Sequence, residues 1–221
     1  MRVEESGKVC YIAGAGDFYG FVKKPSCNDV VIAADGGLAY LEREGIEPDY
    51  VIGDFDSLSS LPTWLGDSTK CRVLPREKDV TDMYAALREG IRRGCKTFHI
   101  YGGLGGRVSH TLANIQLLAD LSQKGIRAYL YGDRSVITSI TDSSMKIPGS
   151  FQGYVSVFSH GERAEGVFLK RFKYPLSEAV LTNDFPLGIS NECTKAEGEI
   201  FVKKGTLIII MEEKGVDNRA E

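Results

Sequence analysis

The sequence predicts a mixed α/β protein, in which a doubly wound, mostly parallel sheet with helices on both faces precedes an all-β sandwich. The first part of the chain alternates short, continuously apolar runs with amphipathic helical patterns, and such runs are typical of parallel strands covered on both faces. After about Asp133 the helical periodicity fades, and short β-rich runs separated by Gly, Pro, Asn and Asp follow. We therefore expect an α/β domain over 1–133 and a β-sandwich domain over 134–221.

Apolar runs and helical periodicity locate the elements of the first domain. Strands are expected at 9–13, 30–34, 50–52, 97–101 and 128–131. Two stretches carry an apolar stripe at helical spacing and end before a glycine, and we expect helices over Asp79–Arg93 and Val108–Lys124. Residues 58–72 have weak periodicity and are expected to form a surface loop with a short helix.

The second domain is expected to consist of short strands joined by hairpins. Their turn residues are the Gly, Pro, Asn and Asp that interrupt the β-rich runs. The strands are expected at 136–140, 154–158, 166–172, 199–202 and 207–211.

Composition excludes several classes of protein. The formal net charge of −3 argues against nucleic-acid binding through a broad basic surface. The strongest apolar run, Leu207 to Met211, is too short to cross a bilayer, and the N-terminal residues do not resemble a secretory signal. Five cysteines without C-x-x-C spacing argue against a disulfide framework or a zinc site. We expect a cytoplasmic protein with neither nucleic acid nor membrane among its partners.

Two carboxylates follow the expected strand at 50–52. Asp54 and Asp56 stand two residues apart, a spacing that puts both side chains on one side of an extended chain. Ligands of open α/β sheets bind at the carboxyl ends of strands, and Mg²⁺ prefers carboxylate and phosphate oxygens. The pair is a candidate magnesium site, with an ordinary turn as the alternative.

Two further carboxylates stand in Lys78-Asp79-Val80-Thr81-Asp82. Asp79 and Asp82 would share one face of a helix. In a purely structural interpretation Asp79 is the N-cap and Asp82 complements the helix dipole. Capping leaves Lys78 unexplained, because a cation at a helix N-terminus is unfavourable unless an anion such as phosphate is bound there.

A glycine-rich segment joins the expected strand at 97–101 to the following helix. It reads Gly102-Gly103-Leu104-Gly105-Gly106-Arg107-Val108-Ser109-His110. Glycine lets the backbone approach a ligand closely, a helix N-terminus favours phosphate, and Arg107 can grip a phosphate with two hydrogen bonds. A tight turn needs only one or two glycines, so we expect phosphate or nucleotide binding here. For His110, packing inside the protein is the alternative.

Two other glycine motifs follow strands. Asp35, in Asp35-Gly36-Gly37, is expected either to meet a nucleotide hydroxyl or to cap the next helix, and the sequence leaves both open. The run from Gly14 to Gly20 looks like a dinucleotide fingerprint. Its third glycine is one position late and follows two bulky aromatic residues, so nicotinamide binding is not expected.

In their order along the chain, these motifs resemble those of the thiamine pyrophosphokinase family. The resemblance extends from about Gly14 to the last expected strand. It rests on Ala34-Asp35-Gly36-Gly37, Gly53-Asp54-Phe55-Asp56-Ser57, Lys78-Asp79-Val80-Thr81-Asp82, Gly103-Leu104-Gly105-Gly106-Arg107 and Gly188-Ile189-Ser190-Asn191-Glu192, the last of which looks like the family's Gly-x-Ser-Asn motif.

The resemblance implies a magnesium-dependent transferase that moves a diphosphate group from ATP to the hydroxyl of thiamine. The α/β domain would bind ATP and the sandwich thiamine, and a homodimer would build each active site between its subunits. The implied metal ligands are Asp54, Asp56, Asp79 and Asp82, and the implied catalytic residues are Asp54, Asp56, Asp82 and Arg107. The implied ATP-binding residues are Asp35, Gly36, Gly37, Lys78, Thr81, Gly103, Gly105, Gly106, Arg107 and His110, and the implied thiamine-binding residues are Ser190 and Asn191.

Three details of the implied site stand out in this chain. The family commonly has an aspartate two residues after the arginine, where this chain has Ser109. The single tryptophan, Trp64, lies outside the expected sandwich, so an aromatic that stacks on thiamine would be one of Tyr174, Phe185 and Phe201. As acceptor of the hydroxyl proton we favour Asp82 over Asp56.

Two other functions stay open. A related pyrophosphokinase would use the same ATP site for another small alcohol, such as a hydroxymethylpterin. A non-catalytic nucleotide sensor would not need the five acids Asp35, Asp54, Asp56, Asp79 and Asp82.

Overall fold

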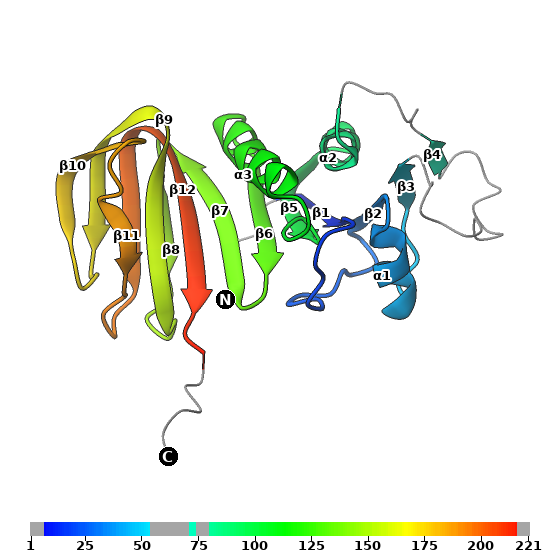
Figure 1. The fold of residues 1–221 in the computed structure, drawn as a ribbon, viewed down its shortest axis with the longest axis horizontal. Coiled ribbons are helices and arrows are strands. Elements are labelled where there is room, and N and C mark those ends of the chain that lie inside the picture. Colours follow the sequence, from blue (N-terminus) through cyan, green and yellow to red (C-terminus); the bar gives the residue numbers. More distant parts are fainter. Residues whose placement is uncertain (1–6, 54–70, 74–79, 216–221) are drawn as a thin grey trace, which may run out of the picture. The chain divides into compact units, whose positions relative to one another are not determined.

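The computed structural model describes residues 7–53, 71–73 and 80–215, which form a mixed, sheet-rich α/β fold (Figure 1). These residues group into two compact units. The α/β unit contains the described residues up to 117 together with 126–133, and the β unit contains 118–125 together with the chain from 134 onwards.

The sheet of the α/β unit is parallel throughout and has the strand order β6-β5-β1-β2-β3-β4. Its strands are β1 (Lys8–Ala13), β2 (Val30–Ala34), β3 (Tyr50–Gly53), β4 (Cys71–Val73), β5 (Cys95–Tyr101) and β6 (Arg127–Gly132). All five predicted strands are confirmed. β4 was not predicted. The loop with a short helix that was expected over 58–72 was wrong for its last two residues, because they pair with β3 and form a strand.

The helices of this unit lie on both sides of its sheet. Helix α1 spans Gly37–Arg43 and helix α2 spans Asp82–Arg92. The crossover from β2 to β3 and the one from β4 to β5 run in opposite directions along the sheet, and right-handed crossovers then place their helices on opposite faces. In Figure 1, α1 and α2 accordingly lie on opposite sides of the strands.

Helix α2 begins three residues later than predicted. Its N-cap is Thr81, whose Oγ1 accepts a hydrogen bond from the N–H of Tyr84 at 3.2 Å. The alternative that Asp79 is the N-cap was therefore wrong, and Asp79 itself lies outside the described residues. The threonine cap satisfies one of the free N–H groups of the first turn, and Asp82 is the first residue of the helix.

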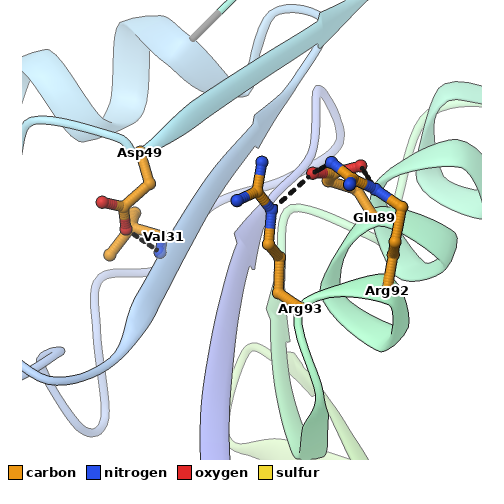
Figure 2. A network of polar contacts seen from close by, with 5 residues as sticks. All are labelled: Val31, Asp49, Glu89, Arg92 and Arg93. Atoms are coloured by element: carbon orange, nitrogen blue, oxygen red, sulfur yellow. Dashed lines mark hydrogen bonds and ion pairs between the residues drawn. The ribbon is translucent and has the colours of Figure 1, made fainter. Parts of the chain in front are cut away.

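A buried carboxylate stabilises the C-terminal end of α2 (Figure 2). Glu89 is only 4% exposed. It accepts hydrogen bonds from Arg92 at 2.9 and 2.6 Å and from Arg93 at 2.9 Å. Figure 2 also shows the carboxylate of Asp49, which accepts the N–H of Val31 at 2.8 Å and so ties the entrance of β3 to β2.

The β unit is an antiparallel sheet of order β10-β9-β12-β7, in which β11 pairs with β9 and β8 with β12. The strands are β7 (Ser135–Thr141), β8 (Ser144–Ile147), β9 (Gly153–Lys170), β10 (Leu176–Thr182), β11 (Gly188–Asn191) and β12 (Gly198–Glu213). Helix α3 (Val108–Gln123) contributes its last turns to this unit, where the hydroxyl of Ser122 lies 2.9 Å from that of Thr141.

Two long strands replace four predicted short ones. The expected strands at 154–158 and 166–172 are both part of β9, although residues 171–172 of the second lie beyond its end. The expected strands at 199–202 and 207–211 are both part of β12. The hairpins predicted between them were wrong, because Gly161, Gly166 and Gly205 have left-handed φ values of 88°, 62° and 114° inside the strands. These glycines bend the strands instead of ending them.

The two halves of each long strand contribute to one core. Val155 and Val157 from the first half of β9 share a buried cluster with Val167 and Leu169 from its second half, and both halves of β12 join them. The sheet therefore folds over on itself.

In the part of the chain that the structure describes, no helix has the length and apolar character that a membrane span needs.

Candidate functional site

The carboxyl ends of β1, β2, β3 and β5 lie at one edge of the parallel sheet, together with the loops that follow β1, β2 and β5. Gly14, just after β1, donates its N–H to the carbonyl of Tyr101 at the end of β5 (2.7 Å). Asp35, just after β2, donates its N–H to the carbonyl of Ile52 in β3 (2.8 Å). In parallel α/β sheets, ligands bind at this edge, so it is the candidate site.

Asp35 lies in the left-handed region with φ 51°, which is uncommon for a residue other than glycine. It packs against the end of β3, since a Cβ added to Gly53 would lie 3.1 Å from the Asp35 Cα. The capping alternative was wrong, because the N-cap of α1 is Gly36 and not Asp35. Strained backbone of this kind is often found at functional positions.

The next two glycines have different reasons to be glycine. A Cβ at Gly37 would lie 1.9 Å from the carbonyl oxygen of Ala13, so the close contact between α1 and β1 permits no side chain there. At Gly36 the nearest atom would be the Cβ of Ala15 at 3.3 Å. Gly37 is thus required for packing, whereas packing limits a side chain at Gly36 much less severely.

The glycine loop, defined here as residues 102–106, packs closely against its surroundings. A Cβ at Gly102 would lie 2.3 Å from the Gly14 carbonyl oxygen, and one at Gly103 would lie 2.6 Å from Leu130 Cδ1. Gly106 has φ 59° with open space beside it. The structure gives packing reasons for glycines that the sequence alone connects with phosphate, and it leaves Gly106 at an open position.

Helix α3 starts at the end of the glycine loop. The Arg107 carbonyl accepts the N–H groups of His110 and Thr111 at 3.0 and 3.2 Å. The side chain of Arg107 is exposed and makes no polar contact with other described residues. His110 is exposed as well, so the alternative that it packs inside the protein was wrong.

A buried asparagine that the sequence analysis missed fixes the glycine loop. Asn114, 7% exposed, donates from Nδ2 to the carbonyl of Gly103 at 2.7 Å. Thr111 Oγ1 donates to the carbonyl of Gly105 at 3.4 Å. A polar residue among the apolar positions of α3 was the available signal, but its partner is set by the tertiary fold.

The described residues contain part of the predicted metal site. Thr81 caps α2 and Asp82, half-buried, opens it. Asp54, Asp56, Lys78 and Asp79 lie outside the described residues. In the described ranges no three or more His, Cys, Asp or Glu side chains are grouped so that they could hold a metal ion.

In the β unit, the two predicted thiamine-binding residues differ in exposure. Ser190 is exposed, has φ 54°, and donates its N–H to Ser156 Oγ at 3.0 Å. Asn191 is only 3% exposed. Its Nδ2 donates to the Tyr174 carbonyl at 2.6 Å, and its Oδ1 accepts the N–H groups of Tyr174 and Glu192 at 3.0 and 2.9 Å. The Asn191 amide is therefore hydrogen-bonded to the backbone of Tyr174 and Glu192 inside the protein and does not face solvent.

The aromatic side chains of this unit also differ. Tyr174 and Phe185 are 60% and 64% exposed, whereas Phe201 is half-buried and packs on Phe168 with ring centroids 5.9 Å apart. Lys173 Nζ lies 5.5 Å from the centre of the Tyr174 ring.

A carboxylate between two lysines lies next to Asn191. Hydrogen bonds from Lys214 and then Lys173 lower the pKa of Glu192 below its ordinary value. These contacts join the loop before β10, the end of β11 and the residue after β12.

Comparison with known proteins gives two family models that together match most of the chain. Residues 23–130 match "Thiamin pyrophosphokinase, catalytic domain" and residues 141–207 match "Thiamin pyrophosphokinase, vitamin B1 binding domain". A thiamine pyrophosphokinase from Bacillus subtilis is 31% identical over 182 residues, which is 81% of this chain and 85% of that protein.

Solved structures are similar over almost the whole chain. A Bacillus subtilis thiamine pyrophosphokinase superimposes with a TM-score of 0.83 at 26% identity and covers 94% of this chain and 100% of its own. A thiamin pyrophosphokinase from Geobacillus thermodenitrificans superimposes with a TM-score of 0.78 at 25% identity, covering 94% of this chain and 99% of its own.

Proposed function

Because the chain belongs to the thiamine pyrophosphokinase family, we propose that it transfers the diphosphate group of ATP to the hydroxyl of thiamine, which gives thiamine diphosphate and AMP. The thiamine oxygen attacks the β-phosphorus, the bond from that phosphorus to the α-phosphate oxygen breaks, and AMP leaves with those electrons. Such transfers depend mainly on positioning and on charge stabilisation. The observation that carries this proposal is the exposed Arg107, which follows the glycine loop without a polar partner among the described residues.

The ATP half of the proposed site lies at the strand-end edge of the α/β unit. Arg107 presents a planar cation suited to phosphate oxygens, directly after the open position at Gly106. The other proposed ATP-binding residues are Asp35, Gly36, Gly37, Lys78, Thr81, Gly103, Gly105 and His110. Of these, Gly37, Gly103 and Gly105 are also required by packing, so their contribution is to shape the site.

We propose Asp54, Asp56, Asp79 and Asp82 as ligands of Mg²⁺. Carboxylate oxygens together with phosphate oxygens are the donors that this ion prefers. Gly53, the residue before Asp54 in the sequence, lies beside Asp35. Bound Mg²⁺ supplies neutralisation of the polyphosphate charge.

Asp82 is the proposed acceptor of the hydroxyl proton, ahead of Asp56. It is half-buried at the start of α2, where Thr81 fixes the helix end. A single-turnover assay of Asp82→Asn tests this role. An unchanged rate of the chemical step would move the role to Asp56.

The β unit is the proposed thiamine-binding part, with Tyr174 as the aromatic that stacks on thiamine. Asn191, the residue after Ser190, holds the backbone of Tyr174 through two hydrogen bonds, whereas Phe201 packs against Phe168. The thiazolium ring of thiamine is a cation, and aromatic faces attract cations. Ser190 would then contact thiamine directly, and Asn191 would act by holding Tyr174.

The β unit also supports the proposal of a homodimer with active sites between its subunits. Phe185, Leu187 and Ile189 are 64%, 45% and 51% exposed and lie close together in the sequence, at and before β11. Exposed apolar groups near a site are commonly covered by a partner. Sedimentation equilibrium of the purified chain tests the dimer, and a monomer at micromolar concentration would contradict it.

The reaction itself is tested with purified protein, ATP and Mg²⁺, in the presence and absence of thiamine. We expect AMP to appear only with thiamine and in equal amount to thiamine diphosphate. A hydroxymethylpterin in place of thiamine serves as the competing alcohol. AMP formation with the pterin alone would replace the proposed substrate, and ATP binding without any AMP would favour a nucleotide sensor.

A further inference from the structure

The loop after β1, here called the β1 loop and comprising residues 14–19, runs alongside the glycine loop. The N–H of Gly16 donates to the Gly102 carbonyl at 2.7 Å, and the N–H of Asp17 donates to the Leu104 carbonyl at 2.8 Å. A Cβ at Gly16 would lie 2.3 Å from the Leu104 oxygen. The two loops are therefore in direct backbone contact.

The carboxylate of Asp17 fills the space over Gly105. A Cβ at Gly105 would lie 2.1 Å from Asp17 Oδ2 and 2.3 Å from Asp17 Cγ, and Gly105 itself has φ 80°. The hydroxyl of Tyr19 donates to Oδ2 at 3.4 Å. A side chain at 105 and the present position of Asp17 are mutually exclusive.

Aromatic packing prevents the β1 loop from moving away. Phe18 stacks on Tyr40 with ring centroids 4.9 Å apart and an angle of 10° between the rings. The Tyr40 hydroxyl donates to the Gly16 carbonyl at 2.9 Å. The backbone of the β1 loop is therefore held in place, and the exposed side chain of Asp17 lies directly against Gly105.

We infer that Asp17 is a positioning residue for the ATP site, which sets the course of the chain through Gly105 and Gly106 and thereby the place of Arg107. This inference rests on the proposed function, since it assumes that Arg107 binds the phosphates of ATP. Displacements on the order of 1 Å of a binding group can reduce rates about a hundredfold, so the restraint matters although Asp17 does not touch ATP.

Shape and charge of Asp17 should act in opposite directions. A carboxylate near a polyphosphate repels it, so its charge disfavours ATP binding and its packing favours it. Asp17→Asn keeps the shape and removes the charge, whereas Asp17→Ala removes both. Asparagine should leave ATP affinity unchanged or raise it, and alanine should lower it.

The test is calorimetric titration of the full-length protein with ATP and Mg²⁺, without thiamine. We expect the dissociation constant of D17A to rise about tenfold, with that of D17N at or below the wild-type value. Equal affinities of D17A and the wild type would overturn the inference alone. Weaker binding by both variants would overturn it as well, because the carboxylate itself would then be a ligand. A wild-type protein that does not bind ATP would overturn the proposed function and this inference together.

Glycine variants test the contact between the two residues without using ATP. Gly94 has φ 82°, close to the 80° of Gly105, and nothing lies near its missing Cβ. G94A therefore measures the cost of a left-handed φ for alanine alone, and it is the matched control for G105A. We expect G105A to lower Tm more than G94A does, and D17A to restore part of the loss in the double variant. Equal losses in G94A and G105A, or no restoration by D17A, would show that Asp17 does not restrain Gly105 and would overturn the inference.

Discussion

The side chain of Asn191 binds both polar backbone groups of Tyr174, donating to its carbonyl at 2.6 Å and accepting its N–H at 3.0 Å. Asn191 also accepts the N–H of Glu192, so its buried amide oxygen has two donors. This single side chain therefore fixes the backbone from which the exposed Tyr174 ring projects.

Asn191→Ala should weaken thiamine binding through Tyr174. Loss of a buried amide that makes three hydrogen bonds should lower the free energy of unfolding by about 2 kcal/mol. The KM for thiamine should rise while the KM for ATP stays constant. Tyr174→Ala should raise the thiamine KM by roughly tenfold, in line with a cation–π contact of about 1–2 kcal/mol. Tyr174→Phe should leave the thiamine KM unchanged, because phenylalanine keeps the aromatic ring.

A double variant and a second aromatic provide the controls for Tyr174. If Asn191 acts through the tyrosine, N191A should add little to the thiamine KM of Y174A. Phe185→Ala removes an equally exposed ring that Asn191 does not hold. A larger rise in thiamine KM for F185A than for Y174A would contradict the choice of Tyr174.

Arg107→Gln should lower kcat/KM for ATP by about 10²- to 10³-fold, the range typical for removing one donor to a developing charge. Arg107→Lys should recover only part of this, because an ammonium group cannot form two parallel bonds to phosphate. Steady-state kinetics at saturating thiamine measures the effect. The matched control is Arg163→Gln in the β unit, where the arginine is exposed and pairs with Glu165 at 2.9 Å. Activity of R107Q within twofold of wild type would rule out its proposed role.

Glu89 should make stability depend on pH in the acidic range. Hydrogen bonds from Arg92, and then from Arg93, lower the pKa of Glu89 below its ordinary value of 4.5. A carboxyl whose pKa falls on folding stabilises the protein above its unfolded pKa, and this contribution is lost as the pH falls towards the folded pKa. Glu89→Gln should lower the free energy of unfolding by about 1–2 kcal/mol at pH 7, and the difference from wild type should shrink below pH 4.5.

Urea denaturation of both proteins between pH 7 and pH 3.5 measures this effect. Asp120→Asn is the matched control, since Asp120 forms a similar helical pair with Lys124 at 2.6 Å but is 44% exposed. Exposed pairs of this kind contribute about 0.5 kcal/mol. If the difference in stability between E89Q and wild type stayed constant across the pH range, Glu89 would not be a source of the pH dependence.

The strands of the α/β unit could be predicted because burial on both faces makes them continuously apolar. Residues 30–34 were predicted and observed with identical bounds. β4 could not be predicted, since three residues carry no periodicity and exist as a strand through pairing with β3. In the β unit, Gly161 and Gly205 indicated turns, but the structure uses their left-handed φ to bend β9 and β12.

The site was predictable where it depends on strand ends. The apolar runs placed Asp35 and Gly53 after neighbouring strands, and the structure brings them into contact. Contacts between distant loops carry no local signal. Asp17 appeared only within a misleading dinucleotide-like run, because its partner Gly105 is far along the chain.

The two glycines before and at the start of α1 should respond differently to alanine. At Gly37 the new Cβ would lie 1.9 Å from the Ala13 carbonyl oxygen, and this backbone cannot move without disturbing β1. Gly37→Ala should therefore lower the free energy of unfolding by about 3 kcal/mol. At Gly36, φ is −58° and the nearest atom would be 3.3 Å away, so Gly36→Ala should change stability by less than about 1 kcal/mol.

The stability of the two variants determines how their activities are interpreted. Since G36A should keep the fold, a rise in its KM for ATP would reflect a Cβ that stands between the backbone and the nucleotide. Reduced activity of G37A would instead follow the fraction of folded protein, and cooling should recover it in proportion. Thermal unfolding and ATP titration of both variants separate these effects. A G37A protein as stable as the wild type would show that α1 can shift away from β1, contrary to the tight packing described above.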